Sequence, residues 1–394
     1  MLKLNKEKLH LSNFEDAILN KINQLKSNAG SHSPSIFNLL ENIPEITLKV
    51  DACFLSNPYA TDLFENYLNQ DIIEKNRLRE LLEFYPSQNQ VIANNLANAL
   101  NVNKENLFVS NGAIEVIQAI MHKYSKKVVL PIPTFSAYYE FLANDAKISL
   151  LKLDKENDYK ISLTSLIDFV KKEVPDTVVI INPNNPTGGY LKLSDIKYFL
   201  DSVPFVENLI LDESFIPFAY EEDAMYPVTM MNLLEDYPNV VIVKSMSKDF
   251  GIAGIRAGYG IMSKEKVNDL LSNGYLWNIN GLAEYFFSLF GRDTFQAEYE
   301  IIRKKYLKET QDFFNELSAI ESLKVIPSLA NFALVELPNG FTAEEVTCIL
   351  LIRYGIYVRN CDDKIGLTGN YIRIASRSVE ENNLVIKALK EMFS

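Results

Sequence analysis

The chain has 394 residues, of which 47% are apolar and 23% charged, so it can bury a large core and is long enough for roughly two or three domains. Its formal net charge of −12 argues against a nucleic-acid-binding protein, although one local group of Arg and Lys side chains would still suit a small anionic ligand. Three widely spaced cysteines and three histidines without metal-ligand spacing predict neither a disulfide framework nor a metal site.

Residues 1–56 are predicted to form an N-terminal segment that packs beside the C-terminal domain. The stretch "SNAGSHSPS" at 27–35 has the composition of a loop. The opening residues "MLKLNKEKLHLSNFED" carry charges throughout, unlike a secretory signal, and no apolar run of the sequence reaches membrane-spanning length. We therefore expect a cytoplasmic protein that does not bind membranes.

Residues 57–281 are predicted to form a large, doubly wound α/β domain. Its short apolar runs are continuous rather than alternating, which is typical of strands buried on both faces of a parallel sheet. Helical segments such as "AIEVIQAIMHKY" and "LSDIKYFLDSV" lie between these runs, and such alternation indicates helices that cover the sheet. The predicted strands lie at 107–110, 127–133, 177–184, 208–214 and 239–245.

Residues 282–394 are predicted to form a smaller α+β domain. The segment "YEIIRKKYLKETQDFFNELSAI" has the pattern of a long amphipathic helix. Strands are expected in "LKVIPSLANFALVEL", "IYVRN" and "YIRIAS", and a closing helix follows Ser378, which is suited to cap it.

Polar residues follow each of the five strands predicted for the large domain. "SNGAIE", "PTFSAY" and "NPNNPTG" follow the first three strands, Asp212 ends the fourth, and Lys248 follows the fifth. Because ligands of parallel α/β sheets bind outside the carboxyl ends of the strands, these groups are expected to face one crevice.

The residue types at these strand ends suit one cofactor in particular. A lysine can form a Schiff base with an aldehyde, and a carboxylate can keep a pyridine nitrogen protonated. Free amides at a helix start, two serines and an arginine suit a phosphate. Each feature alone has a simpler explanation, since Lys248 could be surface, "SNG" a turn and Asp212 a helix cap. Their order at successive strand ends favours pyridoxal phosphate.

In this order, "NPNNPTG", "LDES" and "SMSKDFGIAGIRAGYG" resemble the fold-type I, aspartate-aminotransferase-like enzymes that use pyridoxal phosphate. The resemblance runs from about residue 57 to the C-terminus and is strongest to the branch of histidinol-phosphate aminotransferases and threonine-phosphate or serine-phosphate decarboxylases. It implies an α/β large domain with a mostly parallel sheet, a smaller α+β domain, and a homodimer that acts on a small molecule.

The resemblance also implies a role for each matched residue at the cofactor. Lys248 would form the Schiff base, Asp212 would pair with the pyridine nitrogen and Asn185 would bind the ring oxygen. Phe135 would stack on the ring, with Tyr138 as a second candidate. The residues expected around the phosphate are Ala113 and Ile114 through their backbone, Ser245, Ser247, Arg256 and, from the neighbouring subunit, Tyr85.

Two arginines are expected to bind the substrate. By resemblance, Arg373 in "YIRIAS" would pair with the α-carboxylate. Arg377 follows four residues later, and this spacing on a strand would place both arginines on one face, where Arg377 could hold a second anion such as a phosphate. Alternatively, Arg377 forms a surface ion pair with Glu380 or Glu381.

Three further positions bear on the substrate. His32 in "GSHSPS" would correspond to a loop histidine that closes on the substrate phosphate in the decarboxylases, or is simply an exposed loop residue. Asn57 is also expected near the substrate. Most aminotransferases of this class have a tyrosine three residues after the pyridine-nitrogen aspartate, whereas this chain has Phe215, as the decarboxylases do.

Phe215 and Arg377 favour decarboxylation of L-serine phosphate or L-threonine phosphate to the phosphorylated amino alcohol. The alternative is an aminotransferase that acts on a small phosphorylated ketone or amino acid with glutamate as the amino donor. A non-catalytic, cofactor-binding regulator is disfavoured, because Lys248, Asp212, Asn185 and Arg373 are all present.

Overall fold

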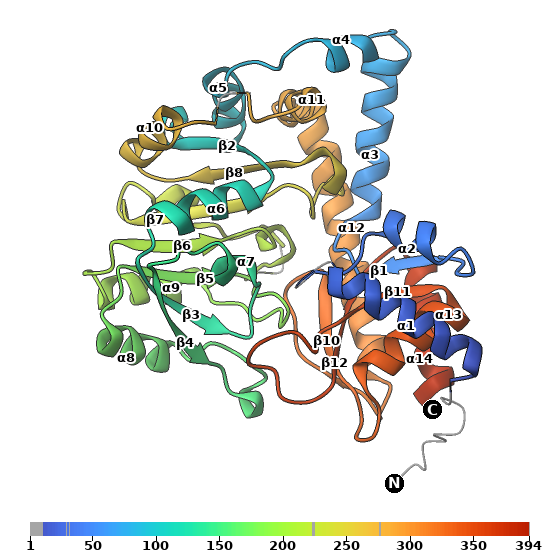
Figure 1. Cartoon of the computed structure of the whole chain (residues 1–394). Helices are drawn as coiled ribbons and strands as arrows, with labels where there is room; N and C mark the ends of the chain where they lie inside the picture. The colour runs from blue at the N-terminus through green and yellow to red at the C-terminus, as the bar shows by residue number, and fades with distance from the viewer. Residues whose placement is uncertain (1–10, 29, 31, 223–224, 276, 394) are drawn as a thin grey trace.

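Two sheets, each with helices packed against it, make up the protein in this computed structural model (Figure 1). The structure describes residues 11–393 apart from residues 29, 31, 223, 224 and 276. Within these residues, no helix combines the length and the apolar character needed to cross a bilayer.

The larger sheet has seven strands and lies in the predicted large domain. All five predicted strands are confirmed as β2, β3, β5, β6 and β7, and the structure adds β4 and β8. Strand β8 is antiparallel to both of its neighbours, whereas β7, β6, β5, β3 and β4 run parallel. In spatial order the strands are β2 (Leu107–Asn111), β8 (Ala257–Ile261), β7 (Val240–Ser245), β6 (Asn208–Asp212), β5 (Thr177–Ile181), β3 (Lys127–Ile132) and β4 (Lys147–Lys152).

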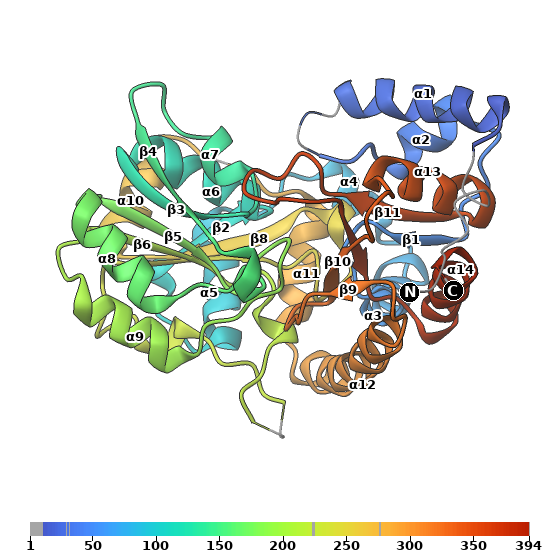
Figure 2. The same ribbon diagram turned by 90° about the horizontal axis from the view of Figure 1, so that it is seen from below.

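Helices cover both faces of this sheet, which explains why its strands are apolar at successive positions (Figure 2). In β5, Val178 and Ile180 belong to one core and Val179 and Ile181 to the other. The core that contains Val179 and Ile181 is covered by α6 (Ala113–Lys123), α7 (Ala137–Glu140) and α10 (Lys264–Ser272). The core that contains Val178 and Ile180, on the opposite face, includes residues of α3 (Pro58–Leu68), α5 (Asn89–Leu100), α8 (Leu163–Glu173), α9 (Leu193–Ser202) and α11 (Gly281–Phe290).

The smaller sheet has five strands, drawn from both ends of the chain. Val50 of β1 pairs in parallel with Ile356 of β11, so strand β1 of the N-terminal segment belongs to the same sheet as the C-terminal strands. Helices α13 (Ala343–Tyr354) and α14 (Val379–Phe393) pack on this sheet, and α1 (Asn13–Asn28) and α2 (Ile36–Asn42) lie beyond α13. The strand order is β1 (Val50–Ala52), β11 (Ile356–Asn360), β12 (Tyr371–Ala375), β10 (Phe332–Glu336) and β9 (Lys324–Val325).

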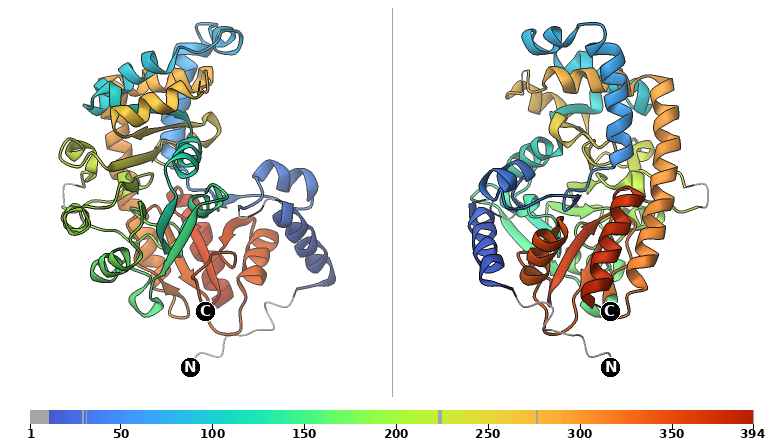
Figure 3. Two further views of the ribbon diagram at one scale, coloured as in Figure 1. Left: turned by 60° about the vertical axis from the view of Figure 1, so that its left-hand side comes forward. Right: turned by 90° about the vertical axis from the view of Figure 1, so that its right-hand side faces the viewer.

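The long helix α12 (Asp293–Ser318) connects the two domains (Figure 3). Its Phe295 and Tyr299 lie in the core of the large sheet, whereas Phe313 and Leu317 lie in the core of the small one. The predicted boundary at residue 281 stays a prediction, and this packing favours a division within α12.

Candidate active site

A cavity of about 220 Å³ lies at the carboxyl ends of the large-sheet strands and is closed by residues of the small domain. It is therefore where the sequence predicted a crevice. The predicted residues that line it are His32, Ala113, Ile114, Phe135, Asn185, Asp212, Ser245, Ser247, Lys248, Arg256 and Arg373.

Lys248 follows β7 and presents its amine to the cavity. Burial, and then the positive charges of Arg373 and Arg256, lower the pKa of this amine to about 8. A larger fraction of the amine is therefore neutral near neutral pH than for an ordinary lysine, and only the neutral amine attacks a carbonyl. The neighbouring Lys244 is committed elsewhere, because its Nζ donates to Asp249 Oδ2 at 2.7 Å in a buried ion pair.

Asp212 ends β6 and is held in one orientation. Its Oδ1 accepts from the backbone N–H of Ser214 at 2.9 Å, and its Oδ2 accepts from the Tyr138 hydroxyl at 2.8 Å. Burial raises the pKa of Asp212, while these hydrogen bonds oppose the rise. A buried carboxylate at the cavity wall suits a cationic partner such as a protonated ring nitrogen. Tyr138 thus orients Asp212, whereas Phe135 lines the cavity and remains the candidate to stack on a ring.

A corner suited to phosphate lies where α6 begins. Helix α6 starts after Gly112, and this residue supplies no side-chain cap for the first turn. A Cβ at Gly258 of β8 would lie 2.6 Å from the Ala113 nitrogen, so a glycine there lets the strand approach the helix start. Arg256 lines the same corner. The buried Ser247 Oγ has no hydrogen-bond partner among the described residues, which points to a ligand acceptor or donor.

These groups fit pyridoxal phosphate. The uncapped helix start, Arg256 and the unpartnered Ser247 hydroxyl suit its phosphate. Lys248 suits its aldehyde, and the oriented Asp212 suits its ring nitrogen. The assignment of individual residues to the cofactor remains our proposal.

Arg373 is fixed inside the cavity wall. Its Nη1 donates to Asn185 Oδ1 at 2.7 Å, and its Nη2 donates to the Cys53 carbonyl at 2.9 Å. Its buried Nε has no partner within the described part of the chain. Asn185 accepts through Oδ1, so its Nδ2 is left as the donor that the predicted contact to the ring oxygen requires.

Two cations of the cavity were missing from the sequence-based prediction. Arg359 on β11 and Lys364 in the following loop are both buried at its wall, and both pair with Asp363. Arg359 lies directly opposite Arg373 in the antiparallel pairing of β11 with β12. No short motif marks these residues, because their meeting depends on the register of two strands.

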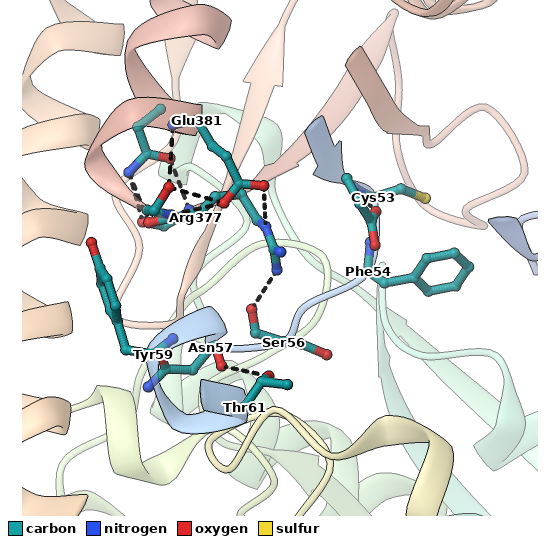
Figure 4. A network of polar contacts seen from close by, with 12 residues as sticks. Cys53, Phe54, Ser56, Asn57, Tyr59, Thr61, Arg377 and Glu381 are labelled. Carbon is teal, nitrogen blue, oxygen red and sulfur yellow. Dashed lines mark hydrogen bonds and ion pairs between the residues drawn. The ribbon is translucent and has the colours of Figure 1, made fainter. Parts of the chain in front are cut away.

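The prediction that Arg373 and Arg377 share one strand face is wrong. Strand β12 ends at Ala375, so the alternation of sides stops before Arg377. The Arg377 guanidinium lies outside the cavity, where Nη1 donates to the Ser56 carbonyl at 2.7 Å and Nε lies 3.5 Å from Glu381 Oε1 (Figure 4). The ion pair with Glu381 is the alternative that the sequence left open.

Two further predicted residues lie outside the cavity of their own chain. Asn57 is buried and caps α3, where its Oδ1 accepts from the Tyr59 and Ala60 N–H groups at 3.1 and 3.4 Å. Its Nδ2 is buried without a hydrogen-bond partner among the described residues, and its backbone N–H donates to the Lys248 carbonyl at 2.9 Å. The expected place of Asn57 near the substrate stays a prediction. Tyr85 is 81% exposed and packs on Trp277, with the ring centroids 5.2 Å apart.

His32 and Phe215 both line the cavity, and their predicted roles stay predictions. His32 lines the cavity beside Phe135, with the ring centroids 6.0 Å apart. Burial and the nearby charges of Lys364 and Arg359 lower its pKa, although Glu140 opposes them. Phe215 also lines the cavity and packs edge-on against Phe332 at 5.1 Å. It brings no hydroxyl to the site.

Comparisons with known proteins show what the whole chain is similar to. L-serine phosphate decarboxylase Cj1436c of Campylobacter jejuni subsp. jejuni is 50% identical over 386 residues, covering 98% of this chain and 99% of that protein. L-serine phosphate decarboxylase of Sulfurospirillum multivorans is 47% identical over 369 residues, covering 93% and 94%. A solved structure of a decarboxylase from Sulfurospirillum multivorans has a TM-score of 0.93 at 45% identity, covering 97% of both chains.

The family model for aminotransferase class I and II matches residues 56–389, which include the large domain, most of the small domain and most residues of the cavity. The chain therefore belongs to the aminotransferase class I and II family, a family of fold-type I enzymes that depend on pyridoxal phosphate.

Proposed function

We propose that the protein decarboxylates L-serine phosphate and releases the phosphorylated amino alcohol and CO2. The observation that carries this proposal is the group of three buried cations at one cavity, Arg359, Lys364 and Arg373. A plain amino acid offers one carboxylate to them, whereas a phosphorylated amino acid offers a carboxylate and a phosphate. The names of two near-full-length relatives support the same substrate.

The two anionic groups of the substrate are assigned to separate cations. Arg373, held by Asn185 and the Cys53 carbonyl, has its Nε left to bind the α-carboxylate. Arg359 and Lys364 are assigned to the phosphate, with His32 beside them on the N-terminal loop. Because both ends of the substrate are held, rotation about its Cα is restricted.

When bound, pyridoxal phosphate would serve as an electron sink that weakens the bonds at the substrate Cα. Arg373, Arg359 and Lys364 select the bond by fixing the carboxylate and the phosphate. Loss of CO2 leaves an electron pair at Cα, and we assign Lys248 to deliver the proton that replaces the carboxylate. Apolar residues of the wall, including Phe54, Leu55 and Phe215, exclude water from this step.

Two assays on the same holoenzyme test the proposal. One measures the release of CO2 and of the phosphorylated amino alcohol, and the other measures amino transfer from glutamate. We expect L-serine phosphate to yield CO2 and the phosphorylated amino alcohol in equal amounts, without any keto acid. L-threonine phosphate serves as the second substrate, to show how the added methyl group is tolerated. Amino transfer from glutamate without CO2 release would overturn the proposal in favour of an aminotransferase.

A homodimer is part of the proposal. Exposed apolar residues gather around α4 (Leu78–Glu83), where Leu82 is 72%, Phe84 66% and Tyr85 81% exposed, and Trp277 lies beside Tyr85. Helices α4 and α11 lie side by side at this end of the molecule (Figure 1). Such a contiguous patch is typical of an interface. A second copy seated there would bring its Tyr85 toward the phosphate corner, as the family resemblance implies. The expected cytoplasmic location stays a prediction.

A further inference from the structure

One peptide group links Arg377 with the backbone of Lys248. The Ser56 carbonyl accepts from Arg377 Nη1 at 2.7 Å, and the Asn57 N–H of the same peptide donates to the Lys248 carbonyl at 2.9 Å. A trans peptide is planar and points its C=O and N–H in opposite directions, so this unit bridges the two residues.

This peptide belongs to a strap, residues 53–57, that runs from β1 of the small domain to α3 of the large one. Small-domain side chains hold its carbonyls. Arg373 Nη2 donates to the Cys53 carbonyl at 2.9 Å, and Asn331 Nδ2 donates to the Leu55 carbonyl at 3.0 Å. Arg377 supplies the third of these contacts. The strap also lines the cavity through Cys53, Phe54 and Leu55.

The far end of the strap is fitted closely to the loop that carries Lys248. Thr61 Oγ1 donates to the Gly251 carbonyl at 2.8 Å and lies 3.2 Å from the Asn57 carbonyl. Gly251 has a φ of +64°, and a Cβ there would lie 2.3 Å from the Asn57 carbonyl oxygen. The end of the strap at Asn57 and the first turn of α3 thus contact the loop at both Lys248 and Gly251.

We propose that Arg377 is a positioning residue that fixes the backbone of Lys248 through the Ser56–Asn57 peptide. A charged donor on a carbonyl polarises its peptide and strengthens the N–H on the other side. Glu381 pairs with the Arg377 Nε and so helps to orient the guanidinium, as Figure 4 shows. Arg377 therefore couples the small domain to the lysine without contacting the substrate. The inference rests on the proposed role of Lys248, but its first test does not.

The first test is hydrogen exchange at the Asn57 amide in the holoenzyme with Arg377→Met, which keeps the aliphatic stem and removes the donor. We expect exchange to accelerate by about tenfold or more, because a charge-assisted hydrogen bond is lost. Arg353→Met is the matched control, since Arg353 pairs with Glu15 on α1, away from the strap. It is expected to leave Asn57 exchange unchanged. Unchanged exchange in Arg377→Met would overturn the proposal.

The second test separates positioning from substrate binding. Arg377→Met should lower kcat for L-serine phosphate and for L-serine by the same factor, and should shift the pKa of the visible absorbance band of the bound cofactor. Arg377→Lys, which retains one donor for the Ser56 carbonyl and is the variant to use if Arg377→Met fails to fold, should recover part of both effects. Loss of the preference for L-serine phosphate, with an unmoved band, would instead make Arg377 a phosphate ligand and overturn the proposal. The exchange and absorbance measurements need no substrate, so they stand if the proposed decarboxylation fails.

Discussion

Arg359 and Arg373 lie directly opposite each other on neighbouring antiparallel strands, and both line the same cavity. Like charges directly opposite each other destabilise a sheet unless a group of opposite charge lies nearby. Asp363 offsets part of this cost, because its Oδ2 lies 2.6 Å from Arg359 Nη2. The remaining positive charge favours a substrate with two anionic groups.

This pair leads to a prediction about substrate choice. Arg359→Ala or Lys364→Met should lower kcat/KM for L-serine phosphate by about 10- to 150-fold, since a charge-assisted pair is worth roughly 1.5–3 kcal/mol. The low rate with L-serine should change little, because L-serine has no phosphate. The measurement is the ratio of kcat/KM for the two substrates, and an equal fall for both would remove these residues from the phosphate site.

Lys248→Ala should abolish turnover and the visible absorbance band that marks covalently bound cofactor. The phosphate corner at Ala113, Ser247 and Arg256 is untouched by this change, so the cofactor should still bind without a covalent bond. Absorbance before and after dialysis tests this expectation. A retained band would assign the covalent bond to another lysine, and Lys244 would then have to leave its ion pair with Asp249.

The lowered pKa of the Lys248 amine predicts how cofactor loading depends on pH. In the apoprotein the neutral amine becomes dominant as the pH rises through about 8, so the rate of cofactor recombination should rise with pH and level off above that value. Arg373→Met removes a positive charge that lowers this pKa, and should therefore move the midpoint to higher pH. Stopped-flow absorbance gives both profiles. A midpoint shifted to lower pH would contradict the proposed electrostatics.

Phe215→Tyr adds a hydroxyl at the cavity wall. If it donates to the cofactor ring oxygen, it should lower the pKa read from the visible band, because the deprotonated form gains a hydrogen bond. A pH titration of the band measures the change, with Phe332→Tyr as the control, since Phe332 packs against Phe215 from outside the cavity. A pKa that stays or rises would mean that position 215 does not face the cofactor.

Leu82→Glu should weaken the proposed dimer. The change places a charge on the exposed apolar patch around α4, where it would be buried without a partner in the interface. Light scattering after gel filtration should show a monomer fraction that grows on dilution, together with a loss of activity. Lys21→Glu, at an exposed ion pair of the small domain, is the control. An unchanged mass would place the interface elsewhere.

Much of the large domain was predictable because its strands are buried on both faces and read as unbroken apolar runs. The sequence did not predict strand β8, because its residues "AGYGI" are mostly small and give little apolar signal. Glycine is needed there for close packing on α6, as Gly258 shows. A hydrophobic pattern predicts a strand from its large apolar side chains. It gives no signal for a strand such as β8, in which small residues are needed for close packing.

The substrate end of the cavity was less predictable. Arg377 was placed by its spacing from Arg373, but the strand ends before it, and no residue type marks that end. Arg359 and Lys364 reach the cavity only because β11 pairs with β12 in one register. Tyr138 likewise follows the same strand as Phe135 but turns to Asp212. Local patterns identified many of the residues that line the cavity, whereas tertiary pairing decides which cations lie beside them.

The pairing of Val50 with Ile356 has a consequence for synthesis of the chain. Strand β1 leaves the ribosome early, yet its partner β11 emerges only after the whole large domain has been made. The large domain can fold first, while the small-domain core waits for the last residues. Until then, the strap has no small-domain side chains to hold its carbonyls, and the loop of Lys248 lacks its fixed neighbour. Covalent capture of the cofactor should therefore be among the last events of maturation, and a nascent chain stalled before β11 should fail to develop the visible band.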